Sequence, residues 1–211
     1  MTTYPYICIE GNIGAGKTTL TRMLSLAWQA YPIYEQFTDN PFLPLFYNDP
    51  DRYGFQVELF FMIERQKQLE QIKPKTDLFQ QLYIADYFFQ KTMLFAGKNL
   101  NSEDFKLFKR LFDVLERNAP QPDLLVYLHK NVDQVYQNIT SRGRSMEQEI
   151  TKPYLQKVQD AYLEYFRRIT HFPILILEMH NIDFENDARH FQMVQDAIRQ
   201  EYLPGVHRLS F

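Results

Sequence analysis

A short glycine-rich segment near the N-terminus carries the clearest chemical signal. Residues 11–18 read Gly-Asn-Ile-Gly-Ala-Gly-Lys-Thr and match G-x-x-x-x-G-K-[ST], the pattern of a phosphate-binding P-loop. Glycines let successive backbone N–H groups converge on an anion without obstruction by Cβ atoms. In such a loop Lys17 lies beside the β- and γ-phosphates of a nucleoside triphosphate, and the Thr18 hydroxyl can ligate Mg²⁺. The predicted phosphate-binding residues are Gly11, Asn12, Ile13, Gly14, Ala15, Gly16, Lys17, Thr18 and Thr19.

The segments on either side of this loop fit the motif. Residues 6–9 form a short apolar run that predicts a strand before the loop. Apolar residues follow the loop at helical spacing, namely Leu20, Met23, Leu24, Ala27 and Trp28. A strand, a glycine-rich loop and a helix in this order are the structural context that a P-loop requires.

Composition narrows the classes of protein that this chain can represent. With 211 residues it is most simply one domain, residues 1–211. A net charge of −3 gives no reason to expect a nucleic-acid polymer as partner. The single cysteine, Cys8, excludes an intramolecular disulfide and a zinc-binding cysteine cluster. We expect a cytoplasmic protein without a membrane partner, because the sequence shows no signal peptide and no apolar run near the roughly 20 residues of a membrane span.

Metal-ligand spacing is also missing among the five histidines. We therefore interpret them as surface or core residues. They are His129, His171, His180, His190 and His207.

Short apolar strands alternate with longer helical patterns along the chain. Such alternation predicts an α/β fold with a parallel sheet flanked by helices, of the P-loop NTPase type. Strands are expected at 6–9, 33–34, 82–85, 123–128 and, as the last strand, 174–177. Helices are expected from Asp49-Pro50 to about 72, then up to 95, and at 103–116, 132–141 and 154–169.

Two local patterns refine this picture. The stretch 38–50 contains three prolines and is expected to begin as an irregular loop. Residues 59–63 are apolar on every side, which predicts a helix covered all round. A parallel sheet binds ligands beyond the carboxyl ends of its strands, and Glu35, Asp86 and the glycine-rich loop all fall at such ends.

Several segments, in order, resemble the deoxyribonucleoside kinase family, which includes deoxycytidine, deoxyguanosine and deoxyadenosine kinases. Residues 9–19 are similar to the family's P-loop, 47–65 to its substrate helix and the turn before it, and 142–148 to its helical lid. Asp183-Phe184 resembles its adenine-side loop. The resemblance covers most of the chain. It implies ATP- and Mg²⁺-dependent phosphorylation of a deoxynucleoside 5′-hydroxyl to the 5′-monophosphate, in nucleoside salvage, by a homodimer.

The resemblance also implies catalytic roles. Glu35 matches the family's general base, which takes the proton of the 5′-hydroxyl. Lys17, Arg142 and Arg144 match the cations around the transferring phosphoryl group, where guanidinium forks bind phosphate oxygens at two points. Asp86 matches the acid that serves Mg²⁺ together with Thr18.

Four further residues match substrate contacts. Tyr47 and Glu147 correspond to the pair that hydrogen-bonds the sugar 3′-hydroxyl. Glu58 and Arg65 are about two turns apart on one helix face. Glu58 stands where the family often has a base-reading glutamine, and ionised glutamate only accepts hydrogen bonds. It favours purine edges that present N–H groups; a register shifted by two residues makes Gln56 the reader instead.

The third strand departs from the family pattern. The family has an acid, an arginine and a serine at the end of this strand, whereas this chain reads Asp86-Tyr87-Phe88. Lys91, a little over one helical turn on, can replace the missing charge but lacks the planar fork of arginine. The departure suggests a bacterial branch that diverged from the animal enzymes.

Two other functions compete with this interpretation. A nucleoside monophosphate kinase resembling thymidylate kinase has a similar loop, but it needs an arginine near the position of Glu35 to meet the acceptor phosphate. A non-catalytic nucleotide-binding module is the third hypothesis. A guanine-reading Asn-Lys-x-Asp segment, which a switch GTPase requires, does not occur in the sequence.

Overall fold

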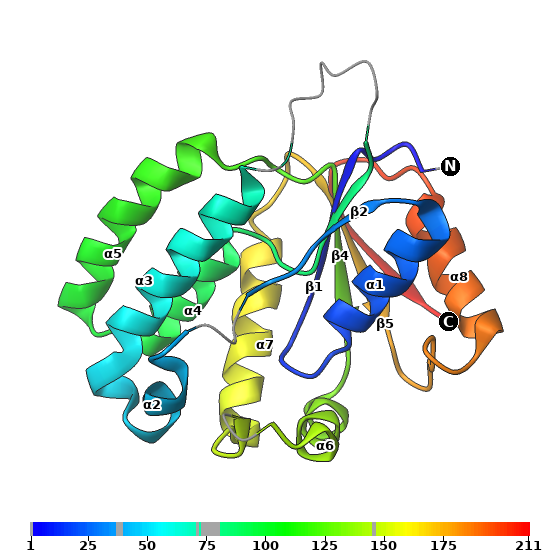
Figure 1. Cartoon of the computed structure of the whole chain (residues 1–211). Helices are drawn as coiled ribbons and strands as arrows, with labels where there is room; N and C mark the ends of the chain where they lie inside the picture. The colour runs from blue at the N-terminus through cyan, green and yellow to red at the C-terminus, as the bar shows by residue number, and fades with distance from the viewer. Residues whose placement is uncertain (1, 37–39, 71, 73–80, 145–146) are drawn as a thin grey trace.

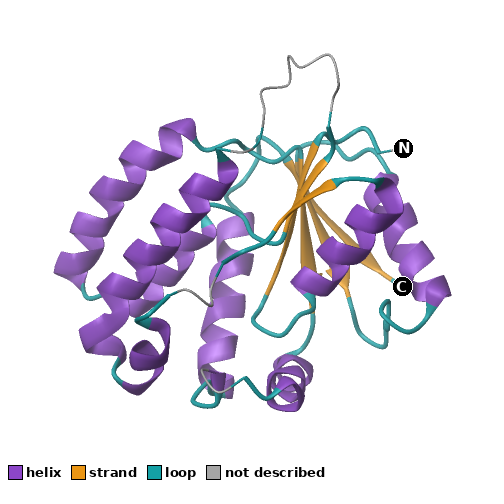
Figure 2. Cartoon of the chain, viewed as in Figure 1, coloured by secondary structure: helices purple, strands orange, loops and turns teal. Residues whose placement is uncertain are grey.

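Six parallel strands form one sheet in the order β2-β3-β1-β4-β5-β6. The computed structural model describes residues 2–36, 40–70, 72, 81–144 and 147–211. The strands are β1 (Tyr6–Gly11), β2 (Tyr31–Ile33), β3 (Tyr83–Ala85), β4 (Leu124–His129), β5 (Pro173–Glu178) and β6 (Gly205–Ser210). Figures 1 and 2 show the sheet with helices on both faces. The predicted α/β fold is confirmed.

The helices divide between the two faces of the sheet. They are α1 (Lys17–Trp28), α2 (Leu43–Asn48), α3 (Pro50–Leu69), α4 (Lys91–Asn99), α5 (Ser102–Leu115), the short 3-10 helix η1 (Glu116–Asn118), α6 (Val132–Arg142), α7 (Lys152–Phe166) and α8 (Ala188–Arg199). Side chains of α3, α4, α5 and α7 pack into one core cluster, and those of α1, α6 and α8 into a second. A third, smaller cluster joins α2 to α3. In Figure 1 the first group lies to the left of the sheet and α1 and α8 to the right.

Local sequence explains where the helix α3 begins. The side chain of Asp49 accepts a hydrogen bond from the backbone N–H of Arg52, and Pro50 occupies the first helical position. A capping acid followed by proline is a strong helix start. The predicted beginning of α3 is therefore correct, although its predicted end at 72 lies beyond Leu69.

Two expectations about the elements were wrong. The strand at 174–177 is not the last, because β6 pairs in parallel with β5. The middle of α3 is not covered all round, since Ile63 is 42% exposed while Met62 is fully buried. The irregular loop expected at the start of 38–50 lies partly outside the described residues, since 38–39 are not described, and the later residues Leu43–Asn48 form the short helix α2.

Candidate active site

The glycine-rich loop joins β1 to α1, as its motif requires. Gly14 and Gly16 have φ angles of 80° and 98°, which side chains with a Cβ rarely adopt. A Cβ on Gly14 would also lie 2.7 Å from the carbonyl oxygen of Val135. The Lys17 ammonium donates to the carbonyls of Gly11 and Asn12, both at 3.0 Å. Burial, with help from the nearby charge of Lys91, lowers the pKa of Lys17 to about 8. An anion bound in the loop would favour the charged form of Lys17 and raise its pKa again.

A buried carboxylate fixes this loop relative to its neighbours. Glu10 is fully buried and accepts hydrogen bonds from the Tyr162 hydroxyl at 2.9 Å and the Phe88 backbone N–H at 2.8 Å. It also accepts from the backbone N–H of Gly11 at 3.1 Å. These bonds join the end of β1 to α7 and to the segment after β3. Glu10 thus has a positioning role that the motif alone did not indicate.

One pocket at the carboxyl edge of the sheet collects most of the predicted site residues. Its walls come from the glycine-rich loop, α2, α3, α4, the start of α7 and the segment after α6. We call it the acceptor pocket. The predicted residues that line it are Ile13, Gly14, Lys17, Thr18, Glu35, Tyr47, Glu58, Arg65, Asp86, Arg142, Arg144 and Glu147.

Two cations hold Glu35 at one end of the acceptor pocket. Arg65 Nε and Lys91 Nζ each lie 2.8 Å from a different oxygen of its carboxylate. Burial by itself would raise the pKa of Glu35, but Lys91 and Arg65 hold it well below its usual range. Thr92 in turn accepts a hydrogen bond from Arg65 at 2.7 Å and fixes the guanidinium. Glu35 is therefore ionised at neutral pH.

Lys91, the lysine that follows the departure from the family pattern, supplies one of these two cations. It is 6% exposed, and its ammonium lies beside Glu35. It also lies 5.6 Å from the centre of the Phe95 ring. Among the described residues, Lys91 and Arg65 form the ion pairs with Glu35.

The residues predicted to bind Mg²⁺ touch each other next to Glu35. The Thr18 hydroxyl donates to Asp86 Oδ2 at 2.6 Å, and the backbone N–H of Glu35 donates to Asp86 Oδ1 at 2.6 Å. Burial raises the pKa of Asp86, with a contribution from the Glu35 charge. A divalent cation at this place would favour the ionised form of Asp86 and so oppose this rise in its pKa. A hydroxyl and a carboxylate beside the phosphate loop are the oxygen donors that Mg²⁺ prefers, so the residues fit this ion.

The segment after α6 carries a cluster of opposite charges. Gly143 ends the helix with a φ of 65°. Glu147 is buried and accepts from Arg142 at 2.5 Å and from Arg144 at 3.4 Å. The predicted lid thus presents its two arginines to the pocket in partnership with Glu147. Residues 145 and 146 of the predicted lid lie outside the described residues.

Glu58 lies at the other end of the pocket in quite different surroundings. It is 2% exposed, whereas Gln56 on the same helix is exposed. Asn99 Nδ2 donates to Glu58 Oε1 at 2.7 Å. The other oxygen, Oε2, is buried without a hydrogen-bond partner among the described residues. Burial raises the pKa of Glu58 to about 7 despite the more distant Arg65 charge. Of the two candidate base readers, Glu58 lines the pocket and Gln56 is not among its lining residues.

Some pocket residues escaped the sequence analysis. Asn99 ends α4 and orients Glu58, and Tyr154 comes from the start of α7. Phe61, within the apolar stretch 59–63, also lines the pocket, with its ring centre 5.0 Å from the Arg65 guanidinium carbon. Apolar side chains of Leu43, Phe46, Val57 and Phe95 complete the wall.

A second, more open hollow lies on the far side of the glycine-rich loop. Asp183 and Phe184 line it together with Gly16, Thr19 and Lys130. A Cβ on Gly16 would lie 3.1 Å from the Phe184 ring, so loop and ring are in direct contact. His190 accepts a hydrogen bond from the backbone N–H of Asp183 at 3.1 Å. The predicted adenine-side residues thus adjoin the phosphate loop, opposite the acceptor pocket.

Phosphate loop, flanking hollow and charged acceptor pocket together define a P-loop phosphotransferase. The model of the deoxynucleoside kinase family matches residues 7–203. The chain therefore belongs to the deoxynucleoside kinase family and is an ATP-dependent kinase, as its sequence predicted.

Individual relatives agree with this assignment. Deoxyguanosine kinase of Bacillus subtilis (strain 168) is 36% identical over 162 residues, which cover 77% of this chain and 78% of the relative. Deoxyadenosine/deoxycytidine kinase of the same organism is 28% identical and covers 91% of this chain and 90% of the relative. Human mitochondrial thymidine kinase 2 is 28% identical, and the match covers 82% of this chain and 69% of the relative.

Solved structures show the same fold. Deoxyadenosine kinase from M. mycoides with bound dATP superposes with a TM-score of 0.77 at 21% identity, over 92% of this chain and 98% of the other. The described part of the chain contains no helix that is both long and apolar enough to cross a membrane.

Proposed function

We propose that this kinase transfers the γ-phosphoryl group of ATP to the 5′-hydroxyl of a purine deoxynucleoside, with Glu35 as the general base. The observation that carries the proposal is the pair of glutamates at opposite ends of one pocket. Glu35 lies beside the phosphate loop, and Glu58 lies deep between α3 and α4. A nucleoside that spans them points its sugar at the phosphate and its base at Glu58.

The reaction needs positioning and charge stabilisation more than strong bases. The 5′-oxygen attacks the γ-phosphorus, the bond to the bridging oxygen of ADP breaks, and the hydroxyl proton passes to Glu35. In a loose transition state the proton leaves late, so an ionised carboxylate of low basicity suffices. Lys91 and Arg65 keep Glu35 ionised and fix its oxygens toward the pocket.

Cations would meet the charge of the transferring group. Lys17 would turn from the carbonyls of its own loop to the phosphates, and Arg142 and Arg144 would exchange part of their contact with Glu147 for phosphate oxygens. Mg²⁺, held by Thr18 and Asp86, would neutralise charge on the β- and γ-oxygens. Phe184 and Asp183 would lie against the donor base. Tyr47 and Glu147 would share the sugar 3′-hydroxyl.

Glu58 gives the proposal its base specificity. The ionised carboxylate accepts two hydrogen bonds and donates none. Among the common bases, guanine presents two adjacent donors, N1–H and N2–H, to such a group. Thymine presents N3–H between two carbonyls that would face the carboxylate. We therefore expect deoxyguanosine to be the best acceptor above pH 7 and purines to exceed thymidine.

A phosphorylation assay across the four deoxynucleosides and four ribonucleosides with Mg-ATP tests the proposal. The expected products are 5′-monophosphates, most rapidly from deoxyguanosine. The Lys17→Ala protein should keep its fold and lose turnover. Phosphorylation of deoxynucleoside monophosphates alone would replace this function by that of a monophosphate kinase. Equal turnover by folded Lys17→Ala would exclude the P-loop mechanism.

A homodimer and a cytoplasmic location complete the proposal. The reduced, buried Cys8 suits a reducing compartment. The outer faces of α3 and α5 expose Ile63, Leu107, Leu111 and Val114, from 39% to 63%. A second copy of the chain on this face would bury the side of α3 that is exposed here, as the apolar residues 59–63 predict. Light scattering should show a dimer that Val114→Lys dissociates, whereas Leu203→Lys, at an even more exposed site elsewhere, should not.

A further inference from the structure

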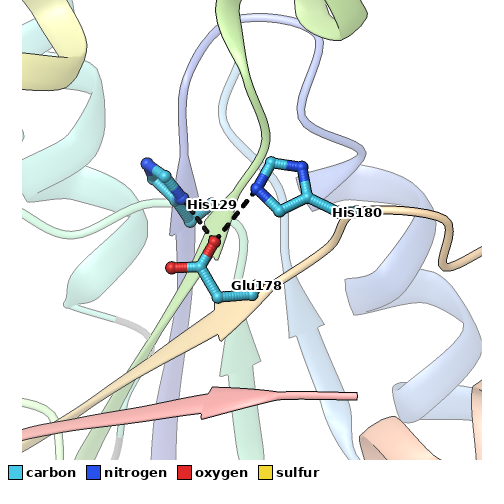
Figure 3. Close-up of side chains that lie close together, drawn as sticks. All are labelled: His129, Glu178 and His180. Atoms are coloured by element: carbon cyan, nitrogen blue, oxygen red, sulfur yellow. Dashed lines mark hydrogen bonds and ion pairs between the residues drawn. The ribbon is translucent and has the colours of Figure 1, made fainter.

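His129, Glu178 and His180 converge at the carboxyl edge of the sheet, away from the acceptor pocket. His129 Nδ1 lies 2.8 Å and His180 Nε2 3.2 Å from the same oxygen of Glu178, Oε2. One ligand atom from each residue falls within 4.8 Å of the others. Figure 3 shows both imidazoles pointing at this carboxylate from opposite sides. From the sequence both histidines were interpreted as surface or core residues, and the proposed reaction does not use this group.

The sheet itself brings the three residues together. His129 ends β4 and Glu178 ends β5, and the two are direct partners in the parallel register. Directly paired residues of neighbouring strands project their side chains to the same face. His180 follows two residues after the end of β5. The cluster therefore rests on regular hydrogen-bonded structure and not on the placement of a surface side chain.

Neighbouring groups orient two of the three side chains. Arg208 on β6 donates from Nε to the second oxygen of Glu178, Oε1, and leaves Oε2 for the imidazoles. Gln159 on α7 lies 3.2 Å from His129 Nε2, and its own Oε1 is buried without a partner in the described structure. If the amide turns over, which hardly changes its shape, Oε1 can accept a hydrogen bond from Nε2–H of His129. The lone pair of Nδ1 then points at the cluster.

We propose that His129, Glu178 and His180 bind a divalent transition-metal ion, with Zn²⁺ the best fit. Two imidazole nitrogens and one carboxylate oxygen form a three-ligand set that zinc accepts, with water in the fourth position. A metal-bound histidine usually donates its other ring N–H to a nearby acceptor, and Gln159 can supply that acceptor. The positive charge of Arg208 opposes the ion and should keep its affinity below that of an all-cysteine site.

The position of the ion indicates a consequence for the fold. His129 precedes Lys130, and His180 precedes Ile182 and Asp183, which all line the hollow on the far side of the phosphate loop. A shared ion would tie together the two segments that form that hollow. Metal binding should therefore stabilise the protein against heat even when no nucleotide is present.

The test is a Zn²⁺ titration of nucleotide-free protein by calorimetry, in excess Mg²⁺ so that oxygen sites near Thr18 are occupied. Substitution by Co²⁺ reports the ligands through its visible absorption. We expect one Zn²⁺ per chain and a Zn²⁺-dependent rise in Tm. His180→Ala should weaken binding by at least about tenfold, as losses around zinc ligands commonly do. His180 is exposed, so this variant should fold.

His171→Ala is the matched control, because His171 is also exposed but lies outside the cluster. It should bind Zn²⁺ like the unchanged protein. Glu178→Gln should weaken binding as His180→Ala does. The proposal is overturned if the unchanged protein binds no Zn²⁺, or if His180→Ala and His171→Ala bind it equally. Circular dichroism without metal should show the same fold in all four proteins.

Discussion

The two ends of the acceptor pocket place a buried glutamate in opposite electrostatic settings. Glu35 contacts Lys91 and Arg65, which hold its pKa well below the usual range against the effect of burial. Glu58 contacts the neutral amide of Asn99 and has one oxygen without a partner, and burial raises its pKa to about 7. Both carboxyl groups are buried, so the cations within hydrogen-bond distance make the difference.

The contrast separates two tasks within one substrate site. The phosphate end must keep a charged carboxylate in a fixed orientation whenever substrate arrives. The base end holds a carboxyl group whose charge changes near neutral pH and with the base that faces it. The same residue type thus serves as a proton acceptor at one end and as a reader of hydrogen-bond donors at the other.

The largest expected effect comes from removing the charge at the phosphate end. Glu35→Gln should lower kcat by about 10²–10⁴-fold, the usual contribution of a general base, with little change in KM. Steady-state kinetics with deoxyguanosine and Mg-ATP measure this. Glu103→Gln, at an exposed position, is the control. An unchanged kcat in folded Glu35→Gln would remove Glu35 from the mechanism.

A somewhat smaller effect is expected from the cation that partners Glu35. Lys91→Met should lower kcat by about 10²-fold, since one charged donor at a reacting centre commonly contributes this much. Lys91→Arg should recover most of the loss, because arginine supplies the same charge. If Met and Arg at this position behave alike, Lys91 acts through packing and not through charge.

The sugar contacts join the two ends, and their loss should lower kcat/KM by at least about tenfold. A 2′,3′-dideoxynucleoside leaves Tyr47 and Glu147 unpaired, at about 1–3 kcal/mol for a buried polar group, with 1.4 kcal/mol equal to one decade. Glu147→Ala with the normal substrate should lose a similar factor in kcat/KM. The two losses should not add, because they remove one contact. Full additivity would show that Glu147 serves only to hold Arg142 and Arg144.

The smallest expected effect is a change in the order of preferred deoxynucleosides when Glu58, at the base end, is replaced. Glu58→Gln replaces a double acceptor by one donor and one acceptor. The ratio of kcat/KM for deoxyguanosine over deoxycytidine should fall by about tenfold, one charge-assisted hydrogen bond at 1.4 kcal/mol per decade. Gln56→Ala, at an exposed position on the same helix, should leave the ratio unchanged. An equal shift in both variants would contradict the role of Glu58.

Apolar runs were sufficient to predict most of the sheet but not its edge. The interior strands β1, β4 and β5 are built largely of consecutive buried apolar residues, so their apolar runs identify them. In β6 the exposed Val206 and Arg208 alternate with half-buried residues, and the strand gains its order from pairing with β5. Because β6 has no apolar run, the sequence alone did not predict it as a strand.

The site divides in the same way. Residues within or next to a recognisable motif, such as Lys17, Glu35 and Arg142, could be named from the sequence. Asn99 and Tyr154 could not, because they reach the pocket only when α4 packs beside α3 and α7 packs beside α4. The charge state of Glu58 was also beyond the sequence, which predicted an ionised acceptor. Its raised pKa depends on burial that only the folded chain defines.

The pH dependence of base selection tests the central claim most directly. Below pH 7 Glu58 is protonated, offers one donor and one acceptor like glutamine, and suits the edges of adenine and cytosine. Above pH 7 it is ionised and suits guanine. The ratio of kcat/KM for deoxyguanosine over deoxycytidine should therefore rise between about pH 6 and pH 8, around a pKa of about 7, and should stay flat in Glu58→Gln. A ratio that is independent of pH in the unchanged enzyme, or that rises equally in Glu58→Gln, would contradict the account.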